Sequence, residues 1–354
     1  MEINKLRGEI DKIDSQLIEL LNKRAEMVLE IARIKEKEGR SYYSPGREKI
    51  VIDRLLALNR GPLPGRELKE ILKTILTCFV SLQRKLRIVY FGPPATFTHL
   101  AAIRNFGHNA EYIPARNIRE IFAMVEKGKA DYGVVPVENS TEGVVSHTLD
   151  MFLDSDLKIC AEVILEVAHY LLGKGKLEDL KKLYSHPQAI AQCRIWLEEH
   201  LPWVKIYETE STAKAAQLAS QEEEACAIAS EIAAALYGLE VLEDHIEDSP
   251  HNYTRFLVIS RDYAERSGQD KTSILFSIKD RVGALYDMLA PFRKYGINLT
   301  KIESRPTKKK AWEYVFFVDF LGHRDDEAVK KALSELEKEC FFLKILGSYP
   351  RGEE

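Results

Sequence analysis

A heptad repeat of apolar residues fills the N-terminal part of the chain, and no glycine or proline interrupts it between Gly8 and Gly39. The apolar positions are Ile3, Leu6, Ile10, Ile13, Leu17, Leu20, Met27, Ile31 and Ile34. This spacing predicts one helix of about 38 residues, which at 1.5 Å per residue is on the order of 55 Å long. So long a helix cannot bury its apolar stripe within a single small bundle. We therefore expect an intertwined homodimer or a higher homo-oligomer.

Two shorter helices are predicted after it, at about 45–58 and about 66–86. Pro45 suits the first turn of the former, and the Gly- and Pro-rich stretch 61–65 separates the two. Residues 1–86 are therefore expected to form an all-α bundle.

Arg24 occupies a core position of the heptad repeat, where a cation needs an anionic partner. Lys35 follows 11 residues later, which is about 20° around a helix, so both cations share one face. Two interpretations remain open: Arg24 sets the register of the bundle by pairing with a glutamate, or it belongs to a buried site for an anionic ligand. Arg7 lies about 100° off that face and would point elsewhere, such as into the pocket of a dimer partner.

The composition excludes several classes of protein. The net charge of −4 provides no basic field for nucleic acid or an anionic membrane, and no run approaches the roughly 18 apolar residues of a membrane helix. The five cysteines are scattered, without a C-x-x-C pair, which argues against disulfides and zinc and favours a cytoplasmic location. No metal and no cofactor is expected.

Residues 87–264 alternate between short apolar strands and helices, which predicts an α/β region with covered sheets. Its length suggests two lobes, with hinges near Val167 and after Val241. The last strand, 256–259, is expected to return to the first lobe. A single strand candidate covers 157–172.

Polar clusters follow the predicted strands. Ser and Thr at such points are ordinary helix caps, and the stretch 249–256 could be a hydrogen-bonded loop between domains. Ligands in open α/β folds also bind beyond the carboxyl ends of strands, so a shared cleft is the alternative. The clusters are Thr96-Phe97-Thr98-His99, Glu138-Asn139-Ser140-Thr141, Ser185-His186-Pro187-Gln188, Glu210-Ser211-Thr212 and Ser249 to Phe256.

Residues 270–354 predict an α+β domain of the order β-α-β-β-α-β. The expected strands are 272–278, 297–304, 314–320 and 341–346, and the helices begin near 280 and 325. A basic triplet, Lys308-Lys309-Lys310, is interpreted as an exposed hairpin turn rather than a nucleic-acid site.

The central region resembles the prephenate dehydratases. The resemblance rests on an ordered set of motifs: Gly92-Pro93-x-x-Thr96-Phe97-x-His99, Pro136-Val137-Glu138-Asn139-Ser140, Ser185-His186-Pro187-Gln188, Glu210-Ser211-Thr212 and Asn252-x-Thr254-Arg255-Phe256. It implies a two-lobed fold like that of periplasmic binding proteins, with the site in the cleft.

The resemblance also implies roles for single residues. Thr254 would lie at the leaving hydroxyl of prephenate, and Glu138 or Glu210 would supply a proton if burial raises the pKa. Asn139, Ser185, Gln192 and Thr212 would position the substrate. Arg255 would orient Thr254 or pair with a carboxylate.

The N-terminal bundle is similar to the helical chorismate mutases. By motif, the residues expected to contact chorismate are Arg7, Arg24, Lys35, Arg47, Glu48 and Gln83, with Arg7 serving the opposite subunit. Arginines suit the two carboxylates, Lys35 and Gln83 the ether oxygen, and Glu48 the ring hydroxyl. Ser44 stands where an acidic residue is frequent, and Phe79 where a small hydroxyl residue is frequent.

The C-terminal region resembles the phenylalanine-sensing ACT regulatory domains. Two motifs carry this resemblance and imply a phenylalanine site: Gly283-Ala284-Leu285 and Glu303-Ser304-Arg305-Pro306. Tyr286 departs from the usual aliphatic residue. The alternative is a domain that serves only dimerisation.

Together these resemblances imply a bifunctional enzyme that converts chorismate to prephenate and prephenate to phenylpyruvate, under feedback inhibition by phenylalanine. Two other readings stay open. One is a dehydratase with a purely structural helical bundle, and the other is a non-catalytic amino-acid-sensing binding protein.

Overall fold

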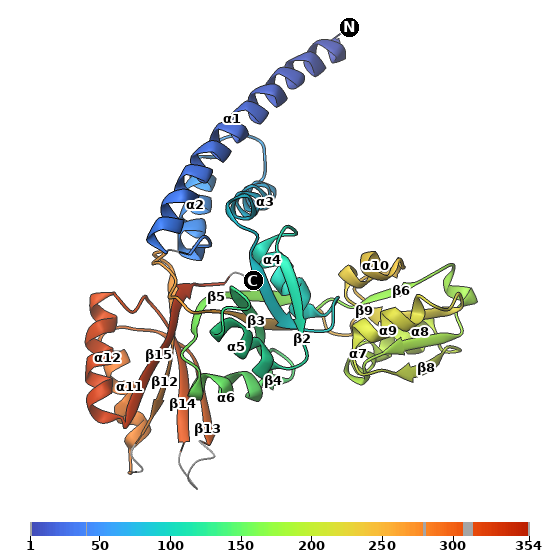
Figure 1. Ribbon diagram of the computed structural model, residues 1–354. Coiled ribbons are helices and arrows are strands. Elements are labelled where there is room, and N and C mark those ends of the chain that lie inside the picture. The colour runs from blue at the N-terminus through green and yellow to red at the C-terminus, as the bar shows by residue number, and fades with distance from the viewer. Residues whose placement is uncertain (1, 40, 279–280, 307–313, 353–354) are drawn as a thin grey trace.

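The computed structural model describes residues 2–39, 41–278, 281–306 and 314–352. Three helices come first: α1 (Glu2–Glu38), α2 (Pro45–Leu58) and α3 (Gly65–Gln83). The long helix is confirmed, and it extends away from the rest of the chain with the N-terminus at its far end (Figure 1). Helix α3 ends three residues before the expected boundary at 86.

The α/β region consists of two lobes, each built on its own sheet (Figure 1). The first lobe contains β1 (Arg87–Phe91), α4 (Phe97–Phe106), β2 (Glu111–Ala115), α5 (Ile118–Glu126), β3 (Tyr132–Asn139), β4 (Gly143–Val144), α6 (Ser146–Asp154), β5 (Lys158–Glu166) and β11 (Tyr253–Ser260). Its sheet has the order β2-β1-β3-β11-β5, with β4 beside β3. The final strand β11 returns to this lobe and lies antiparallel between β3 and β5, as expected.

The second lobe contains β6 (Tyr170–Gly173), the 3-10 turn Leu177–Asp179, β7 (Lys182–Ser185), α7 (Pro187–Gln192), α8 (Arg194–His200), β8 (Lys205–Glu208), α9 (Thr212–Ala219), β9 (Ala225–Ala229), α10 (Glu231–Tyr237) and β10 (Glu240–Glu243). The predicted strand 157–172 is two strands, because residues 167–169 cross between the lobes. The return crossover is 244–252. The expected hinge after Val241 therefore lies a few residues later, since Val241 belongs to β10.

The two crossover segments are hydrogen-bonded to each other. The Val167 N–H donates to the Asn252 carbonyl at 2.7 Å, and the Ile246 N–H donates to the His169 carbonyl at 3.0 Å. The two crossover segments therefore form a hydrogen-bonded floor between the lobes, and this floor holds its side chains in fixed positions.

The C-terminal domain contains β12 (Asp270–Ser277), α11 (Ala284–Lys294), β13 (Leu299–Pro306), β14 (Tyr314–Leu321), α12 (Glu327–Glu339) and β15 (Phe342–Pro350). This is the predicted β-α-β-β-α-β order, and the sheet order is β13-β14-β12-β15. The basic triplet 308–310 lies outside the described residues. Strand β15 runs four residues past the expected end, because Gly347, usually a strand breaker, lets β15 cross β5 at backbone distance.

The C-terminal sheet packs one face on α11 and α12 and the other on the first lobe (Figure 1). One continuous core spans this contact and includes Phe152, Leu257, Phe317 and Leu346. The first lobe is therefore covered on its outer face by the C-terminal domain. Within the described residues, no helix is long and apolar enough to cross a membrane.

Candidate active sites

The helical bundle encloses a pocket of about 610 Å³ that collects most of the cations singled out in the sequence. Its lining includes Arg24, Lys35, Arg47, Glu48 and Gln83. The Arg24 Nη1 and Gln83 Oε1 atoms are buried and have no hydrogen-bond partner among the described residues. Buried polar groups of this kind are costly unless a ligand satisfies them, so the pocket is built to hold a polar molecule.

The two departures noted in the sequence have structural explanations. The Phe79 ring lies under the Arg24 guanidinium, 4.4 Å from the ring centroid, and therefore orients this cation. Ser44 caps α2 and donates to the Glu265 carboxylate at 2.8 Å. The acidic group missing at position 44 is thus supplied by the segment between β11 and β12.

Gly46 allows this segment to approach α2. A Cβ at Gly46 would lie 2.0 Å from the Glu265 carbonyl oxygen, so only glycine fits without a backbone shift. Glu265 also lines the pocket. Sequence reasoning missed it because it lies far along the chain, in a segment with no motif.

Glu48 lines this pocket and has a pKa shifted from its ordinary value into the neutral pH range. Burial raises the pKa of Glu48 to about 7, and the charge of Lys73 works in the opposite direction. Arg7 lies outside the pocket, on the exposed part of α1.

A second, larger cavity of about 1010 Å³ lies between the two α/β lobes. Five of the eight residues predicted for the dehydratase site line it: Asn139, Gln192, Glu210, Thr212 and Thr254. Asn139 and Thr254 come from neighbouring strands of the first lobe, where they are paired partners in the β3–β11 ladder. Gln192 and Thr212 come from the ends of helices in the second lobe.

Hydrogen bonds fix the orientation of the amide groups in this cleft. The Asn139 Oδ1 accepts from the backbone N–H groups of Thr141 and Glu142, at 2.9 and 3.1 Å. Its Nδ2 therefore faces the cleft, where it donates to Asn252 Oδ1 and to Thr254 Oγ1, both at 2.8 Å. Because Thr254 Oγ1 accepts this bond, its own hydrogen remains free to donate to a ligand.

The chain of hydrogen bonds continues across the cleft floor. Since Asn252 Oδ1 is the acceptor from Asn139, its Nδ2 is the donor to Gln192 Oε1, at 3.3 Å. Gln192 Oε1 also lies 2.7 Å from His169 Nε2. Five polar residues from both lobes and both crossovers therefore form one connected set.

The other three predicted residues do not line the cleft, so direct contact with the substrate is corrected for each of them, while the role of Arg255 in orienting Thr254 stays a prediction. Ser185 is fully buried, and its hydroxyl donates to the Ile228 carbonyl at 2.9 Å. Glu138 and Arg255 lie on the opposite face of the first sheet, because side chains alternate along a strand and their neighbours Asn139 and Thr254 face the cleft.

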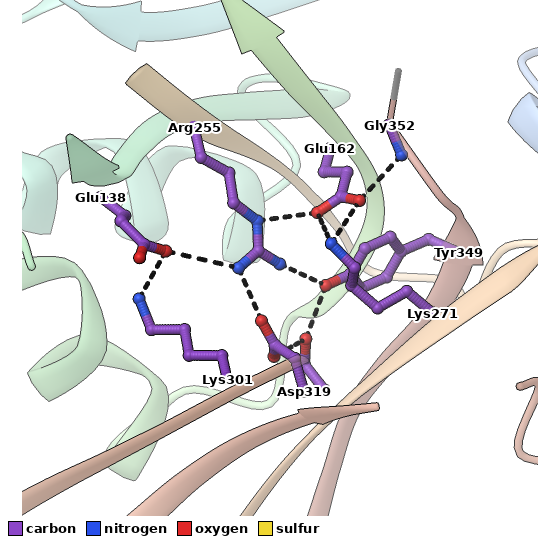
Figure 2. A network of polar contacts seen from close by, with 9 residues as sticks. Glu138, Glu162, Arg255, Lys271, Lys301, Asp319, Tyr349 and Gly352 are labelled. Atoms are coloured by element: carbon purple, nitrogen blue, oxygen red, sulfur yellow. Dashed lines mark hydrogen bonds and ion pairs between the residues drawn. The ribbon is translucent and has the colours of Figure 1, made fainter. Parts of the chain in front are cut away.

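Arg255 instead joins the first lobe to the C-terminal domain, as Figure 2 shows. Its guanidinium donates to Glu162 at 2.7 Å, to Asp319 at 2.6 Å and to the Tyr349 hydroxyl at 3.0 Å. Glu138 accepts from Lys301 at 2.6 Å, on β13. These contacts hold the reverse side of the strands that carry Asn139 and Thr254.

The charges in this interface are balanced. Lys271 pairs with Glu162 at 2.7 Å, and the Gly352 N–H also donates to Glu162 at 2.8 Å (Figure 2). Burial alone would raise the pKa of Asp319, but the charge of Arg255 and hydrogen bonds from Ser273 and Arg255 hold it below its ordinary value.

The seven residues predicted to bind phenylalanine occupy two elements of the C-terminal domain. Gly283 precedes α11 with a φ of +79°, which glycine adopts without strain, and Ala284 and Leu285 begin that helix. Glu303, Ser304, Arg305 and Pro306 lie on the edge strand β13. Arg305 also donates to Ser146 at 2.7 Å and Asp150 at 3.3 Å, on α6.

Sequence reasoning missed His169 altogether. It carries no motif, and the signal that could have found it is its place in the predicted hinge near Val167, where a polar residue stands before an apolar strand. Among the described residues, no group of three or more His, Cys, Asp or Glu side chains is placed to hold a metal ion.

Three protein families match successive parts of the chain. They are chorismate mutase type II at residues 6–84, prephenate dehydratase at 88–264 and the ACT domain at 272–338. The fold and the two cavities therefore define a multi-domain enzyme with a helical mutase, a two-lobed dehydratase and a regulatory domain.

Curated relatives match over nearly the whole length. The bifunctional chorismate mutase/prephenate dehydratase of Aquifex aeolicus is 50% identical, covering 99% of this chain and 98% of that protein. The protein of the same name from Pseudomonas aeruginosa is 42% identical over the same shares. The chain belongs to the family of bifunctional chorismate mutase/prephenate dehydratases.

Solved structures agree for the dehydratase and ACT parts. Prephenate dehydratase from Arthrobacter aurescens, in complex with L-Phe, is 37% identical with a TM-score of 0.68, covering 75% of this chain and 90% of that chain. The prephenate dehydratase of Staphylococcus aureus is 31% identical with a TM-score of 0.66.

Proposed function

We propose that the helical pocket rearranges chorismate to prephenate and that the interlobe cleft removes water and CO₂ from prephenate to give phenylpyruvate. The observation that carries the second activity is the hydrogen-bonded set ending at Thr254, whose free O–H can donate to the leaving hydroxyl. The purified protein supplied separately with each substrate should turn over both. Turnover of prephenate alone would reduce the bundle to a structural role.

In the mutase pocket, Arg24 and Arg47 bind the carboxylates of chorismate, and Lys35 and Gln83 stabilise charge on the breaking ether oxygen. The reaction is unimolecular and needs no nucleophile. The pocket therefore acts by holding the folded conformer and by electrostatic stabilisation.

The ionised form of Glu48 accepts from the ring hydroxyl in this proposal, which predicts a pH dependence. Because the pKa is raised to about 7, the ionised fraction falls as the pH decreases through that value. We expect kcat/KM for chorismate to fall below pH 7. Glu48→Gln should remove this limb and lower the rate about tenfold at pH 8, where a charge-assisted bond becomes a neutral one. A rate that instead rises with acidification would mean that protonated Glu48 is the active form.

The mutase pocket is completed by a second copy of the chain. The apolar positions of the N-terminal half of α1 are exposed, including Leu6 at 55% and Leu20 at 63%, and a paired helix would cover them. Arg7 lies on this same half of α1 and would reach the partner's pocket.

Subunit mixing tests this arrangement. Arg7→Ala and Arg24→Ala should each abolish mutase activity as pure proteins. After the two are unfolded and refolded together, half of the dimers are mixed, and each mixed dimer holds one intact site. Recovery of about one quarter of the wild-type rate is expected. No recovery would place Arg7 in its own subunit's site, and a pure Arg7→Ala protein that is fully active would place it outside any site.

The ACT domain binds phenylalanine and inhibits the dehydratase in this proposal. The solved relative from Arthrobacter aurescens is a complex with L-Phe, which supports phenylalanine as the effector. The effector site in this proposal is formed by Gly283 to Leu285 and Glu303 to Pro306. By linkage, a prephenate analogue should weaken phenylalanine binding by the same factor by which phenylalanine weakens analogue binding.

A further inference from the structure

His169 lies in the first crossover between the lobes and is held from several sides. Only 2% of the residue is exposed, and it lines the interlobe cleft. Its backbone N–H donates to the Glu247 carboxylate at 2.8 Å. Its ring meets Phe97 edge to face, with centroids 5.9 Å apart. The imidazole therefore has one fixed position at the floor of the cleft.

The hydrogen-bonded set in the cleft determines which ring nitrogen carries the proton. Gln192 Oε1 has no hydrogen, so the 2.7 Å contact requires His169 Nε2–H as the donor. The amide of Gln192 cannot be turned around, because its Oε1 also accepts from Asn252 Nδ2. In the neutral ring, Nδ1 therefore carries the lone pair.

This Nδ1 atom is buried and has no hydrogen-bond partner among the described residues. His169 lines the substrate cleft, and a histidine with one ring nitrogen anchored and the other without a partner is suited to exchange a proton with a ligand that enters beside it. Building on the dehydratase function proposed above, we propose that His169 Nδ1 is the proton donor to the leaving hydroxyl of prephenate.

The reaction balances with one proton from this imidazolium. The C–O bond of the ring hydroxyl breaks as Nδ1–H delivers its proton, and water leaves. The bond to the ring carboxylate breaks at the same time, CO₂ leaves, and its electron pair completes the aromatic ring. His169 ends neutral, with the lone pair again on Nδ1, and solvent restores the proton before the next turnover.

The surroundings of His169 set when it is protonated. Burial lowers the pKa of His169 below its ordinary value, and the hydrogen bond to Gln192 and the charge of Glu247 offset only part of this decrease, so the ring is neutral at neutral pH before substrate binds. The other titratable groups that line the cleft are Arg116, Glu142, His186 and Glu210. A bound dianionic substrate adds two negative charges and favours the imidazolium. Substrate binding is therefore accompanied by proton uptake.

Thr254 has a complementary task in this scheme. A threonine hydroxyl is a poor acid, and its free hydrogen can hold the leaving oxygen by a hydrogen bond without transferring a proton. Glu138 cannot supply the proton from its position on the reverse face of the sheet. Glu210 is exposed at the cleft and is the competing donor.

The pH dependence of the purified enzyme tests the proposal. Both substrate carboxylates are ionised from pH 6 to 9. The wild-type kcat/KM for prephenate should therefore fall with rising pH as His169 loses its proton. The corresponding fall in kcat should lie at higher pH, because bound substrate favours the imidazolium. His169→Gln should lower kcat by about 100-fold or more and flatten the profile. Its chorismate turnover, measured on the same sample, reports that the chain is folded. His200→Gln, an exposed histidine on α8, should behave like the wild type.

A second variant does not depend on losing the histidine. Gln192→Glu places a carboxylate against Nε2–H, which should raise the pKa of His169 and move the kcat/KM limb upward by about one pH unit or more. If His169 had only a structural role, Gln192→Glu would leave the kcat/KM limb at its wild-type pH.

The outcomes separate the possible failures. A His169→Gln enzyme that keeps the wild-type limb would overturn the proposal, and loss of that limb in Glu210→Gln would then assign the donor to Glu210. An unmoved limb in Gln192→Glu also counts against His169. A wild-type protein that leaves prephenate unchanged would contradict the proposed dehydratase function itself.

Discussion

Thr254→Val should lower the dehydratase kcat by about 100- to 1000-fold while chorismate turnover stays unchanged. Valine keeps the shape of threonine but removes the O–H that faces the cleft. In the wild type this hydroxyl accepts from Asn139 at 2.8 Å and so has its hydrogen free for the leaving group. Loss of one preorganised donor to developing charge typically costs this much. Steady-state rates with prephenate and chorismate on one preparation make the measurement.

Thr254→Ser is the matched control, because it keeps the hydroxyl and its acceptor role toward Asn139. Its rate should stay within about tenfold of wild type, since the loss of a methyl group only loosens the rotamer. A Thr254→Val enzyme with near wild-type kcat would remove Thr254 from the chemistry. A rise in KM with an unchanged kcat would assign it to ground-state binding.

The order of the elements in the helical bundle and the C-terminal domain could be predicted from sequence, because it rests on local periodicity, whereas in the α/β region the short strands β4 and β10 were not predicted. The heptad of α1 and the alternating apolar strands of the C-terminal domain need no knowledge of distant contacts. The break between β5 and β6 was located only as a hinge near Val167, since an apolar run continues through it.

The motifs identified the right strands for the dehydratase site but not the right face of each strand. Thr254 and Arg255 are adjacent in one motif, yet one faces the cleft and the other faces the C-terminal domain. A motif contains every residue that a site and its support require, and period-2 alternation assigns neighbours to opposite faces. The burial of that reverse face depends on a domain far along the chain.

Residues without a motif could not be found by this reasoning. Glu265 reaches the mutase pocket from a linker, and His169 reaches the dehydratase cleft from a crossover. Both positions are set by how domains dock on one another, which no local pattern reports.

Arg255→Met should destabilise the dehydratase and C-terminal domains by about 3–5 kcal/mol at neutral pH, the usual cost of removing one partner from a buried ion pair. The variant leaves the carboxylates of Glu162 and Asp319, with side chains 0% and 9% exposed, without their guanidinium. Lys271 still pairs with Glu162, so Asp319 is the carboxylate most affected by the loss of Arg255. Denaturant unfolding followed by circular dichroism measures the difference.

Arg194→Met is the matched control, because Arg194 forms an ion pair of 2.8 Å with Glu198 on the surface of α8, where both side chains are well exposed. Its loss should cost less than about 1 kcal/mol. A similarly small effect for Arg255→Met would show that water reaches these charged groups in solution, contrary to their burial in the structure.

The pH dependence of this loss has a definite sign. In the wild type the pKa of Asp319 is below its ordinary value, so its contribution is present above the unfolded-state pKa and is lost only as the pH falls through the lowered value. Without Arg255, burial is left to dominate and should raise that pKa. The deficit of the variant should therefore shrink on acidification toward pH 4, because a protonated Asp319 no longer needs a cation.

The same substitution tests whether Arg255 connects the effector domain to the cleft. Arg255 follows Thr254 in β11, and its three hydrogen-bond partners come from β5 of the first lobe and β14 and β15 of the C-terminal sheet (Figure 2). A shift of that sheet on binding phenylalanine would pull on the strand that places Thr254. Arg255→Met that still folds should bind phenylalanine but lose most of the inhibition of prephenate turnover. Inhibition that persists at wild-type strength would mean that the coupling runs through other contacts, such as Arg305 with α6.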